Sequence, residues 1–295
     1  MTKSQKGTIL VLISAIFYSL GGLMIKMIPW DGFLLNAGRS FISIFVYGIF
    51  LAVIRHKPKM NGWVFFGAVV IALNNTMFAV ATKLTAAGNV AVLQFTAPVF
   101  IILISFIAFH KLPTRLDAVA SAIVIIGIIC FFVDSVGGGN FKGDLLAVSC
   151  GLVYAVVFML NEMPGGDPLS SVFWSAFLGT LFGIPSMLSG GVPPLDTTAL
   201  LMLLGMGLIQ TGAAYLFLMV GMQYSTPIAG ILTSAVQPIL SPVLVAVFYG
   251  EYITPMACVG AVIVVATIVT YNILKERALN RNGIQQTPGE EESVV

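Results

Sequence analysis

The sequence predicts an all-α integral membrane protein with ten transmembrane helices, arranged as two inverted repeats of five helices. Three observations predict this fold class: an apolar composition, ten runs long enough to cross a bilayer, and an internal repeat. Of 295 residues, 58% are hydrophobic and only 9% are charged, whereas a soluble domain carries roughly 25% charged residues. This composition does not provide a water-soluble surface, and the net charge of +2 gives no indication of a nucleic-acid partner.

The ten runs are defined by the polar and Pro/Gly clusters between them. A bilayer core needs about 20 mostly apolar residues per helix, and the connections are short, so neighbouring helices are expected to run antiparallel. The predicted spans are 7–28, 33–54, 63–82, 86–109, 116–133, 143–161, 170–188, 199–220, 228–248 and 255–274. The polar residues 276–295 lack periodicity and are expected to form a disordered cytoplasmic tail.

The distribution of Lys and Arg predicts the orientation, because short cytoplasmic loops are enriched in these residues. With the N-terminus inside, the inner segments hold Lys3, Lys6, Arg55, Lys57, Lys59, Lys111, Arg115, Lys275, Arg277 and Arg281. The outer loops hold Lys83 and Lys142. This asymmetry places both termini in the cytoplasm of a bacterial-type plasma membrane and requires an even number of spans.

An internal repeat divides the chain into residues 1–137 and 138–275. At a shift of 136 positions, Lys6, Tyr18 and Asp31 fall on Lys142, Tyr154 and Asp167. At a shift of 140, Gly67 and Pro98 fall on Gly207 and Pro238. Since five is an odd number of helices, the second half is expected to be inverted relative to the first, an arrangement from which alternating access arises.

Three segments carry a resemblance to a known family: "LLNAGRS" with Arg39, "QFTAPVFIILISFIAFHKLPT", and its counterpart "TSAVQPILSPVLVAVFYGEYIT". With the doubled unit, the chain resembles the ten-helix EamA-type transporters of the drug/metabolite transporter superfamily over residues 7–274. One departure is His110-Lys111 where the second half has Gly250-Glu251, since an acidic residue is common there in both halves of the family. The resemblance implies a carrier of amino acids or similar small neutral or zwitterionic metabolites.

Paired helix breaks point to the transport pathway. Pro98 and Pro238 lie mid-span in equivalent helices, and Pro242 follows one turn later. Proline removes a backbone hydrogen bond and kinks a helix, and interruptions at corresponding positions of two halves indicate a substrate site. The alternative is a kink that only shapes helix packing.

Polar and aromatic side chains near mid-depth are the candidate substrate-binding residues. Buried amides require hydrogen-bond partners, which predicts that they face a cavity or neighbouring helices, where interhelical bonds contribute about 0.6 kcal/mol each. The candidates are Tyr18, Asn74, Asn75, Phe78, Gln94, Tyr154, Trp174, Gln210, Tyr215 and Gln237.

Charged residues within or near spans are candidates for gating or ion pairs. They are Lys26, Arg39, Glu162 and Glu251. Arg39 is expected either to pair with Asp31, two turns back, or to contact a substrate carboxylate. Because no predicted span has Asp or Glu near its middle, we expect facilitated diffusion or exchange, or coupling through a carboxylate near a span end, such as Glu162.

No catalytic set is visible. The chain has no P-loop and no metal-ligand spacing, and its three cysteines lie in apolar runs without C-x-x-C spacing. We therefore expect no enzyme activity, no metal and no cofactor. The leading hypothesis is an alternating-access exporter of small metabolites, with the substrate and the lipid bilayer as partners, as a monomer or homodimer. The alternatives are an importer of an organic cation or nucleoside-like solute and, in a different class, a membrane scaffold or enzyme.

Overall fold

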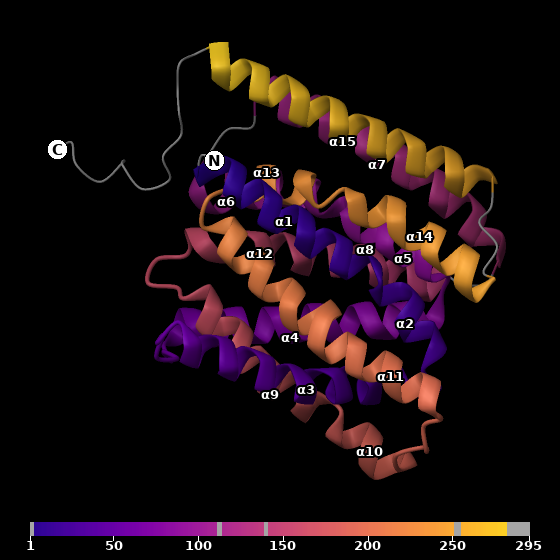
Figure 1. The fold of residues 1–295 in the computed structure, drawn as a ribbon. Coiled ribbons are helices and arrows are strands. Elements are labelled where there is room, and N and C mark those ends of the chain that lie inside the picture. The colour runs from indigo at the N-terminus through magenta and orange to yellow at the C-terminus, as the bar shows by residue number, and fades with distance from the viewer. Residues whose placement is uncertain (1–2, 111–113, 139–140, 251–254, 282–295) are drawn as a thin grey trace.

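The computed structural model describes residues 3–110, 114–138, 141–250 and 255–281, and all regular elements in these ranges are helical. The helices run roughly along one axis as a bundle, and α1 (Lys3–Ser19) begins at the same end where α15 (Pro255–Arg281) finishes (Figure 1). We call this the terminal end and the other the opposite end. Glu251 and residues 282–295 lie outside the described residues.

In the first half of the chain, short helices join into longer segments. α1 continues into α2 (Gly21–Met27), and α5 (Ala87–Leu93) continues through η1 (Gln94–Thr96) into α6 (Ala97–Phe109). The remaining elements are α3 (Gly32–Val53), α4 (Gly62–Leu84) and α7 (Arg115–Gly138).

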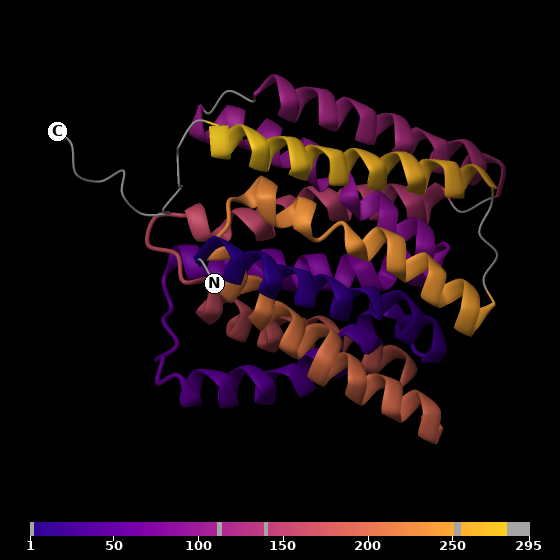
Figure 2. The same cartoon turned by 45° about the horizontal axis from the view of Figure 1, so that its top comes forward.

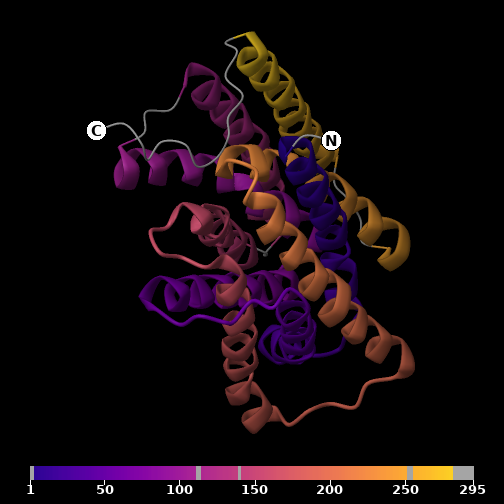
Figure 3. The ribbon, with the colours of Figure 1, turned by 60° about the vertical axis from the view of Figure 1, so that its left-hand side comes forward.

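The second half follows the same order of segments. It consists of α8 (Phe141–Met159), η2 (Leu160–Glu162), α9 (Pro168–Phe182), α10 (Ile184–Gly190), α11 (Thr197–Gly205), η3 (Met206–Ala213), α12 (Ala214–Met222), α13 (Pro227–Thr233), α14 (Val236–Tyr249) and α15. An extended connection, residues 191–196, joins α10 to α11 at one edge of the bundle (Figure 3).

Eight helical segments in the described ranges are long and apolar enough to cross a membrane, and Cys258–Tyr271 is a shorter apolar helix. The eight are Gln5–Met27, Gly32–Val53, Gly62–Leu84, Ala87–Ile107, Phe141–Glu162, Pro168–Gly190, Thr197–Met222 and Pro227–Tyr249. They coincide with eight of the predicted spans to within a few residues. α15 continues to Arg281, so residues 276–281 are helical where disorder was expected.

Polar caps fix where several helices begin. Asp31 accepts hydrogen bonds from the backbone N–H groups of Phe33 and Leu34 at the start of α3. Asn61, Asp167 and Asp196 accept from residues at the starts of α4, α9 and α11. Such caps satisfy donors that the first helical turn leaves free, which explains why short polar connections separate the apolar runs.

The two halves interleave in the bundle. α1 packs against α12 and α14, α3 against α9 and η3, and α4 against α8 and α9. α7 and α15 pack along each other as a pair at one edge (Figure 2). The centre of the bundle is therefore walled by helices from both halves.

Two segments are broken at equivalent positions. Phe95 in η1 has a non-helical backbone (φ −76°, ψ 16°), and a turn at Ser234 and Ala235 separates α13 from α14. At a shift of 140 positions these breaks coincide. Pro98 and Pro238 each follow within the first turn of the next helix, where a missing N–H is tolerated, and Pro242 lies inside α14.

Candidate functional site

A small cavity lies at the centre of the bundle. It is lined by Tyr18, Arg39, Asn74, Asn75, Phe78, Gln94, Tyr154, Gln210, Tyr215 and Gln237. These are nine of the ten candidate substrate-binding residues together with Arg39. The space open to a water-sized molecule is about 20 Å³, which is room for about one water, so the lining side chains nearly fill the cavity in this conformation.

Arg39 is the charged group of this cavity, and its side chain is 1% exposed. Its Nε donates to Asn36 Oδ1 (3.0 Å), one terminal nitrogen donates to Gln210 Oε1 (3.2 Å), and the other donates to the Asn75 carbonyl (2.7 Å). All three acceptors are neutral. Among the described residues, no carboxylate forms an ion pair with Arg39.

The expected pair between Arg39 and Asp31 does not form. The Asp31 carboxylate caps α3 and accepts from the hydroxyl of Ser186. The pairing was implausible on geometric grounds, because helix residues three or four apart are neighbours and residues eight apart are not.

The π-helix η3 presents Gln210 to Arg39. π-helical turns are rare and frequently occur at functional sites. Here the carbonyl of Gly207 accepts from Ser43 Oγ (2.8 Å), and the carbonyl of Thr211 accepts from Tyr47 Oη (2.9 Å). These bonds from α3 hold the irregular backbone against the helix that carries Arg39.

Amide groups and a tyrosine hydroxyl connect four segments around the cavity. Asn74 Nδ2 donates to Tyr215 Oη (3.3 Å), and this hydroxyl donates to Asn75 Oδ1 (3.2 Å). Gln94 Nε2 and Cys150 Sγ both donate to Asn74 Oδ1, at 3.3 and 3.2 Å. Cys150 is one of the three cysteines in apolar runs and was not among the candidate site residues; its position one turn before Tyr154 on α8 is the signal that could have placed it there.

Two buried polar atoms of lining residues have no hydrogen-bond partner: the hydroxyl of Tyr18 and Oε1 of Gln237. The Tyr18 ring packs edge-on against Tyr215, with ring centroids 5.3 Å apart, and Gln237 is 3% exposed. A buried polar group without a partner costs about 1–3 kcal/mol. A solute or water that reached these atoms would therefore remove this cost.

Trp174 does not line this cavity, so its prediction as a substrate-binding residue is not supported by the structure. Its Nε1 donates to the carbonyl of Lys59 (3.0 Å), and its ring packs against Phe173 and Phe177. The buried face of α9 is formed instead by small residues such as Ser171 and Ser175. Trp174 thus attaches the α3–α4 connection to α9.

The other charged candidates lie near the ends of the bundle. Lys26 Nζ donates to the Thr85 carbonyl (2.9 Å) at the opposite end, and Glu162 lies in η2 at the terminal end. Sequence analysis missed Asp144, which is fully buried near the start of α8 and accepts from Thr85 Oγ1 (2.7 Å). Its other oxygen has no hydrogen-bond partner.

The repeat partners Asp31 and Asp167 lie at opposite ends of the bundle, and each cap also contacts the other half. We call the contact of Asp31 with Ser186 the opposite-end latch. The terminal-end latch consists of His56, Asp167 and Ser170: Asp167 Oδ2 lies 2.7 Å from His56 Nε2 and accepts from Ser170 Oγ at 2.9 Å. Burial alone would raise the pKa of Asp167, but the hydrogen bonds from Ser170 and the contact with His56 outweigh it and lower the pKa.

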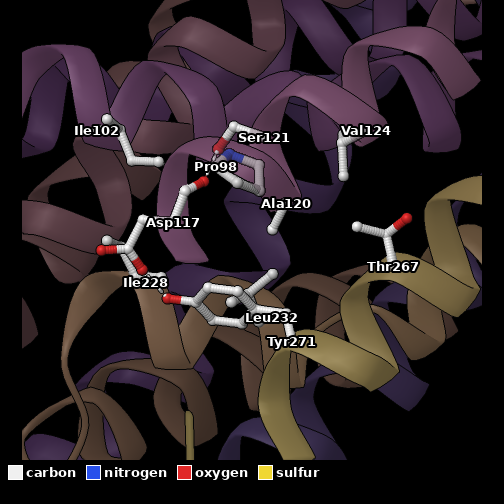
Figure 4. Close-up of a pocket in the computed structure, with 10 residues that line it drawn as sticks. All are labelled: Pro98, Ile102, Asp117, Ala120, Ser121, Val124, Ile228, Leu232, Thr267 and Tyr271. Atoms are coloured by element: carbon white, nitrogen blue, oxygen red, sulfur yellow. Dashed lines mark hydrogen bonds between the residues drawn. The ribbon is translucent and has the colours of Figure 1, made fainter. Parts of the chain in front are cut away.

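A second cavity lies between α6, α7, α13 and α15 (Figure 4). The hydroxyl of Tyr271 donates to the Asp117 carboxylate there, and Thr114 and Asp117 bond to each other's backbone N–H as a capping box at the start of α7. Pro98 lines this cavity, whose other side chains are mostly apolar. The arrangement docks α15 on α7 and offers few polar groups to a solute.

Comparison with known proteins identifies the chain. The EamA-like transporter family model matches it twice, over residues 5–133 and 141–273. The chain belongs to the EamA-like transporter family. The predicted membership in the drug/metabolite transporter superfamily, the doubled unit and the absence of enzyme activity are confirmed: the protein is a multi-pass, non-enzymatic membrane transporter with two EamA repeats.

One curated protein and one solved structure are similar to this chain. An uncharacterized transporter of Clostridium kluyveri is 24% identical over 301 residues, covering 92% of this chain and 95% of the relative. A solved crystal structure matches with a TM-score of 0.69 at 18% identity, covering 93% of this EamA-like transporter and 99% of that chain. At this identity the second likeness shows the fold alone. Neither relative specifies a substrate.

Proposed function

We propose that this EamA-like transporter is a secondary carrier that exports small neutral or zwitterionic metabolites of amino-acid size by alternating access through the central cavity. The observation that carries the proposal is that side chains from both EamA repeats converge on one narrow, polar cavity. Asn75 and Tyr215 occupy equivalent positions at a shift of 140, and they bond to each other at 3.2 Å. A contact between equivalent residues is expected near the axis that relates two repeats.

In the proposed architecture, α7 and α15 complete a set of ten crossing segments, and the second EamA repeat is inverted relative to the first. The terminal end faces the cytoplasm, because the α3–α4 connection at that end carries Arg55, Lys57 and Lys59. Lys83 and Lys142 lie at the ends of α4 and α8 that face outward. The protein then acts in a plasma membrane as a monomer or homodimer.

Alternation requires that the lining helices separate, because the narrow cavity has room for about one water. The breaks at η1 and at Ser234–Ala235, together with the π-helix η3, interrupt the segments that carry Gln94, Gln237 and Gln210. Changes at a few backbone positions allow hinge motion of packed elements. The two latches hold the ends, and opening one end at a time exposes the cavity to one side.

The lining favours exchange or facilitated diffusion over central proton coupling. Among the described lining residues there is no Asp or Glu, and the carboxylates of Asp144 and Glu162 lie near the ends of α8. The positive charge of Arg39 also argues against the alternative of an organic-cation importer, since such a site would want a negative or purely aromatic environment.

The test is counterflow in proteoliposomes. Vesicles loaded with one unlabelled solute are diluted into the same solute in labelled form, across a panel of amino acids, amines and nucleosides. We expect labelled uptake for some amino acids above protein-free vesicles, reduced in Asn75→Ala and retained in Trp174→Phe, whose side chain lies outside the cavity. No counterflow for any solute in the panel would overturn the proposal.

A further inference from the structure

The connection between α3 and α4 presents a cluster of positive charges at the terminal end. Arg55, Lys57 and Lys59 are exposed within five consecutive residues, and residues 52–63 contain no Asp or Glu. We call these three residues the basic connection. Like charges so close together repel one another, which favours a partner of negative charge at this surface.

Carboxylates of the protein do not supply that partner within the part of the chain that the structure describes. No ion pair there joins Arg55, Lys57 or Lys59 to an acidic side chain. The nearest acidic connection, between α8 and α9, carries Asp167, and its carboxylate is bonded to His56 instead (2.7 Å). The basic connection therefore keeps its three charges for a partner outside the chain.

Exposed apolar side chains flank the basic connection on both sides. Val53 and Ile54 precede it and are 75% and 45% exposed, and Met60 and Trp63 follow it at 54% and 46%. Tryptophan is enriched where a membrane meets water, and exposed apolar residues of a membrane protein face the acyl chains. The basic connection is thus positioned at the depth of the phospholipid headgroups.

The backbone of the basic connection is fixed by its contacts with α9 and the chain before it. The N–H of Lys59 donates to Ser170 Oγ (2.9 Å), and its carbonyl accepts from Trp174 Nε1 (3.0 Å). Asn61 Nδ2 donates to the carbonyl of Gly165 (2.9 Å). A surface whose backbone is already ordered loses less conformational entropy when a partner binds.

The backbone conformation of Arg55 indicates that its side chain has a role beyond the fold. Its φ is +56°, a value that is costly for a residue with a side chain and that glycine usually adopts at the end of a helix. The equivalent residue at a shift of 136 is Gly191, with φ +69°. The same difference recurs between His110 (φ +52°) and Gly250 (φ +74°). The second repeat uses the residue that suits this backbone, whereas the first repeat has a basic residue there, and such strained positions cluster at functional sites.

We propose that the basic connection is a docking surface for the phosphate headgroups of anionic phospholipids in the leaflet at the terminal end. Each Lys or Arg close to an anionic membrane surface contributes about fivefold in affinity, and an Arg also matches a phosphate with two parallel N–H groups. A zwitterionic phospholipid has no net charge and lacks most of this attraction. Lipid binding is measured without transport, so its failure would leave the carrier proposal intact.

The competing explanation is that these charges only direct the orientation of the chain during insertion. The two explanations differ in the inserted, folded protein. Charges that act only during insertion give the folded protein no preference among phospholipids, whereas a docking surface selects the anionic ones.

Quenching of tryptophan fluorescence by brominated phospholipids measures this preference. The full chain is reconstituted in mixtures of phosphatidylglycerol and phosphatidylcholine in which one of the two lipids is brominated, and the quenching that is lost in Trp63→Phe reports the lipid beside the basic connection. We expect at least about a fivefold preference for phosphatidylglycerol, weakened in 1 M NaCl, where the Debye length is about 3 Å. Equal quenching by the two lipids would overturn the proposal, and so would a preference that millimolar inorganic phosphate abolishes at constant ionic strength, because the surface would then bind a soluble anion.

Substitutions assign the preference to the three side chains. The combined variant Arg55→Gln, Lys57→Gln and Lys59→Gln should show a preference close to one. Lys142→Gln, which removes an exposed charge at the opposite end, is the matched control and should keep the wild-type preference. An unchanged preference in the folded triple variant would refute the assignment. If the triple variant does not fold, the three single variants decide, and each should lose part of the preference.

Arg55→Gly separates lipid binding from a purely structural role of Arg55. Glycine adopts a positive φ without steric cost, so the variant should melt in lipid-free detergent at or above the wild-type temperature. Its preference for phosphatidylglycerol should nevertheless fall by about fivefold. A lower melting temperature together with an unchanged preference would show that Arg55 serves only the fold and would remove it from the docking surface.

Discussion

Gly151→Ala tests whether the broken segment at η1 positions the cavity. A Cβ atom at Gly151 would lie 2.0 Å from Thr96 Oγ1 and 2.9 Å from the Gln94 carbonyl oxygen, against an ordinary contact of 3.4 Å or more. The Thr96 hydroxyl can rotate away only by losing its bond to the Leu93 carbonyl (3.1 Å), and the backbone carbonyl must shift by about 0.5 Å. Overpacking of this kind costs about 1–3 kcal/mol.

The matched control for Gly151→Ala is Gly48→Ala, because Gly48 lies inside α3 and a Cβ there meets only Phe173 at an ordinary 3.8 Å. Both substitutions gain the same intrinsic helix propensity, about 0.5–1 kcal/mol. We therefore expect Gly151→Ala to melt below Gly48→Ala by about 2–4 °C for each kcal/mol, measured on detergent-purified protein. Counterflow should also fall, because Gln94 moves away from Asn74. Equal melting temperatures and equal transport for the two variants would show that η1 does not lie against α8.

Three further predictions concern the latches and the polar network. Asp167→Asn should lower stability by up to about 1 kcal/mol at neutral pH. Because the pKa of Asp167 is lowered in the folded protein, the difference between wild type and variant should be complete at pH values above the ordinary carboxyl pKa and should vanish as the pH falls through the lowered pKa. Melting curves recorded across this pH range check the prediction. A double-mutant cycle of Asn75→Ala and Tyr215→Phe should give a coupling energy of about 0.6 kcal/mol, and zero coupling would contradict their contact. Tyr271→Phe removes the donor to buried Asp117 and should lower the free energy of unfolding by about 1–3 kcal/mol. Amide hydrogen exchange in the variant should become faster in α15 and stay unchanged in α9, which serves as the internal comparison.

The sequence predicted the lining of the cavity better than the roles of its charges, and the reason is physical. An amide in an apolar helix must face a partner, so Asn74, Asn75 and Gln94 identify the inner face of their helices without knowledge of the packing. Trp174 carries no such constraint, because an indole is stable facing lipid, a loop or a cavity. Its placement depended on the rotation of α9, which the small residues Ser171 and Ser175 reveal only in the folded protein.

The charged residues were harder to place because their partners lie far away in the sequence. Asn36, which orients Arg39, is one helical turn away and could have been predicted from the spacing of neighbours on a helix. Gln210 is 171 residues away, and its contact with Arg39 depends on the π-helix η3, for which no sequence rule is available. Asp144 lies near the start of a predicted span and reads as an ordinary first-turn carboxylate, yet it is fully buried against Thr85.

The two latches show how unequal chemistry can be added to a doubled fold. Asp31 and Asp167 are equivalent in the repeat and both cap a helix, but the position equivalent to His56 is Val192. The opposite-end latch therefore uses the hydroxyl of Ser186, whereas the terminal-end latch uses an imidazole. In the proposed alternating-access cycle, two identical repeats would give the same energy to the conformation open at the terminal end and to the one open at the opposite end. The contacts between the two halves are therefore unequal at the two ends, one made through the Ser186 hydroxyl and the other through the His56 imidazole, although both repeats supply an equivalent aspartate.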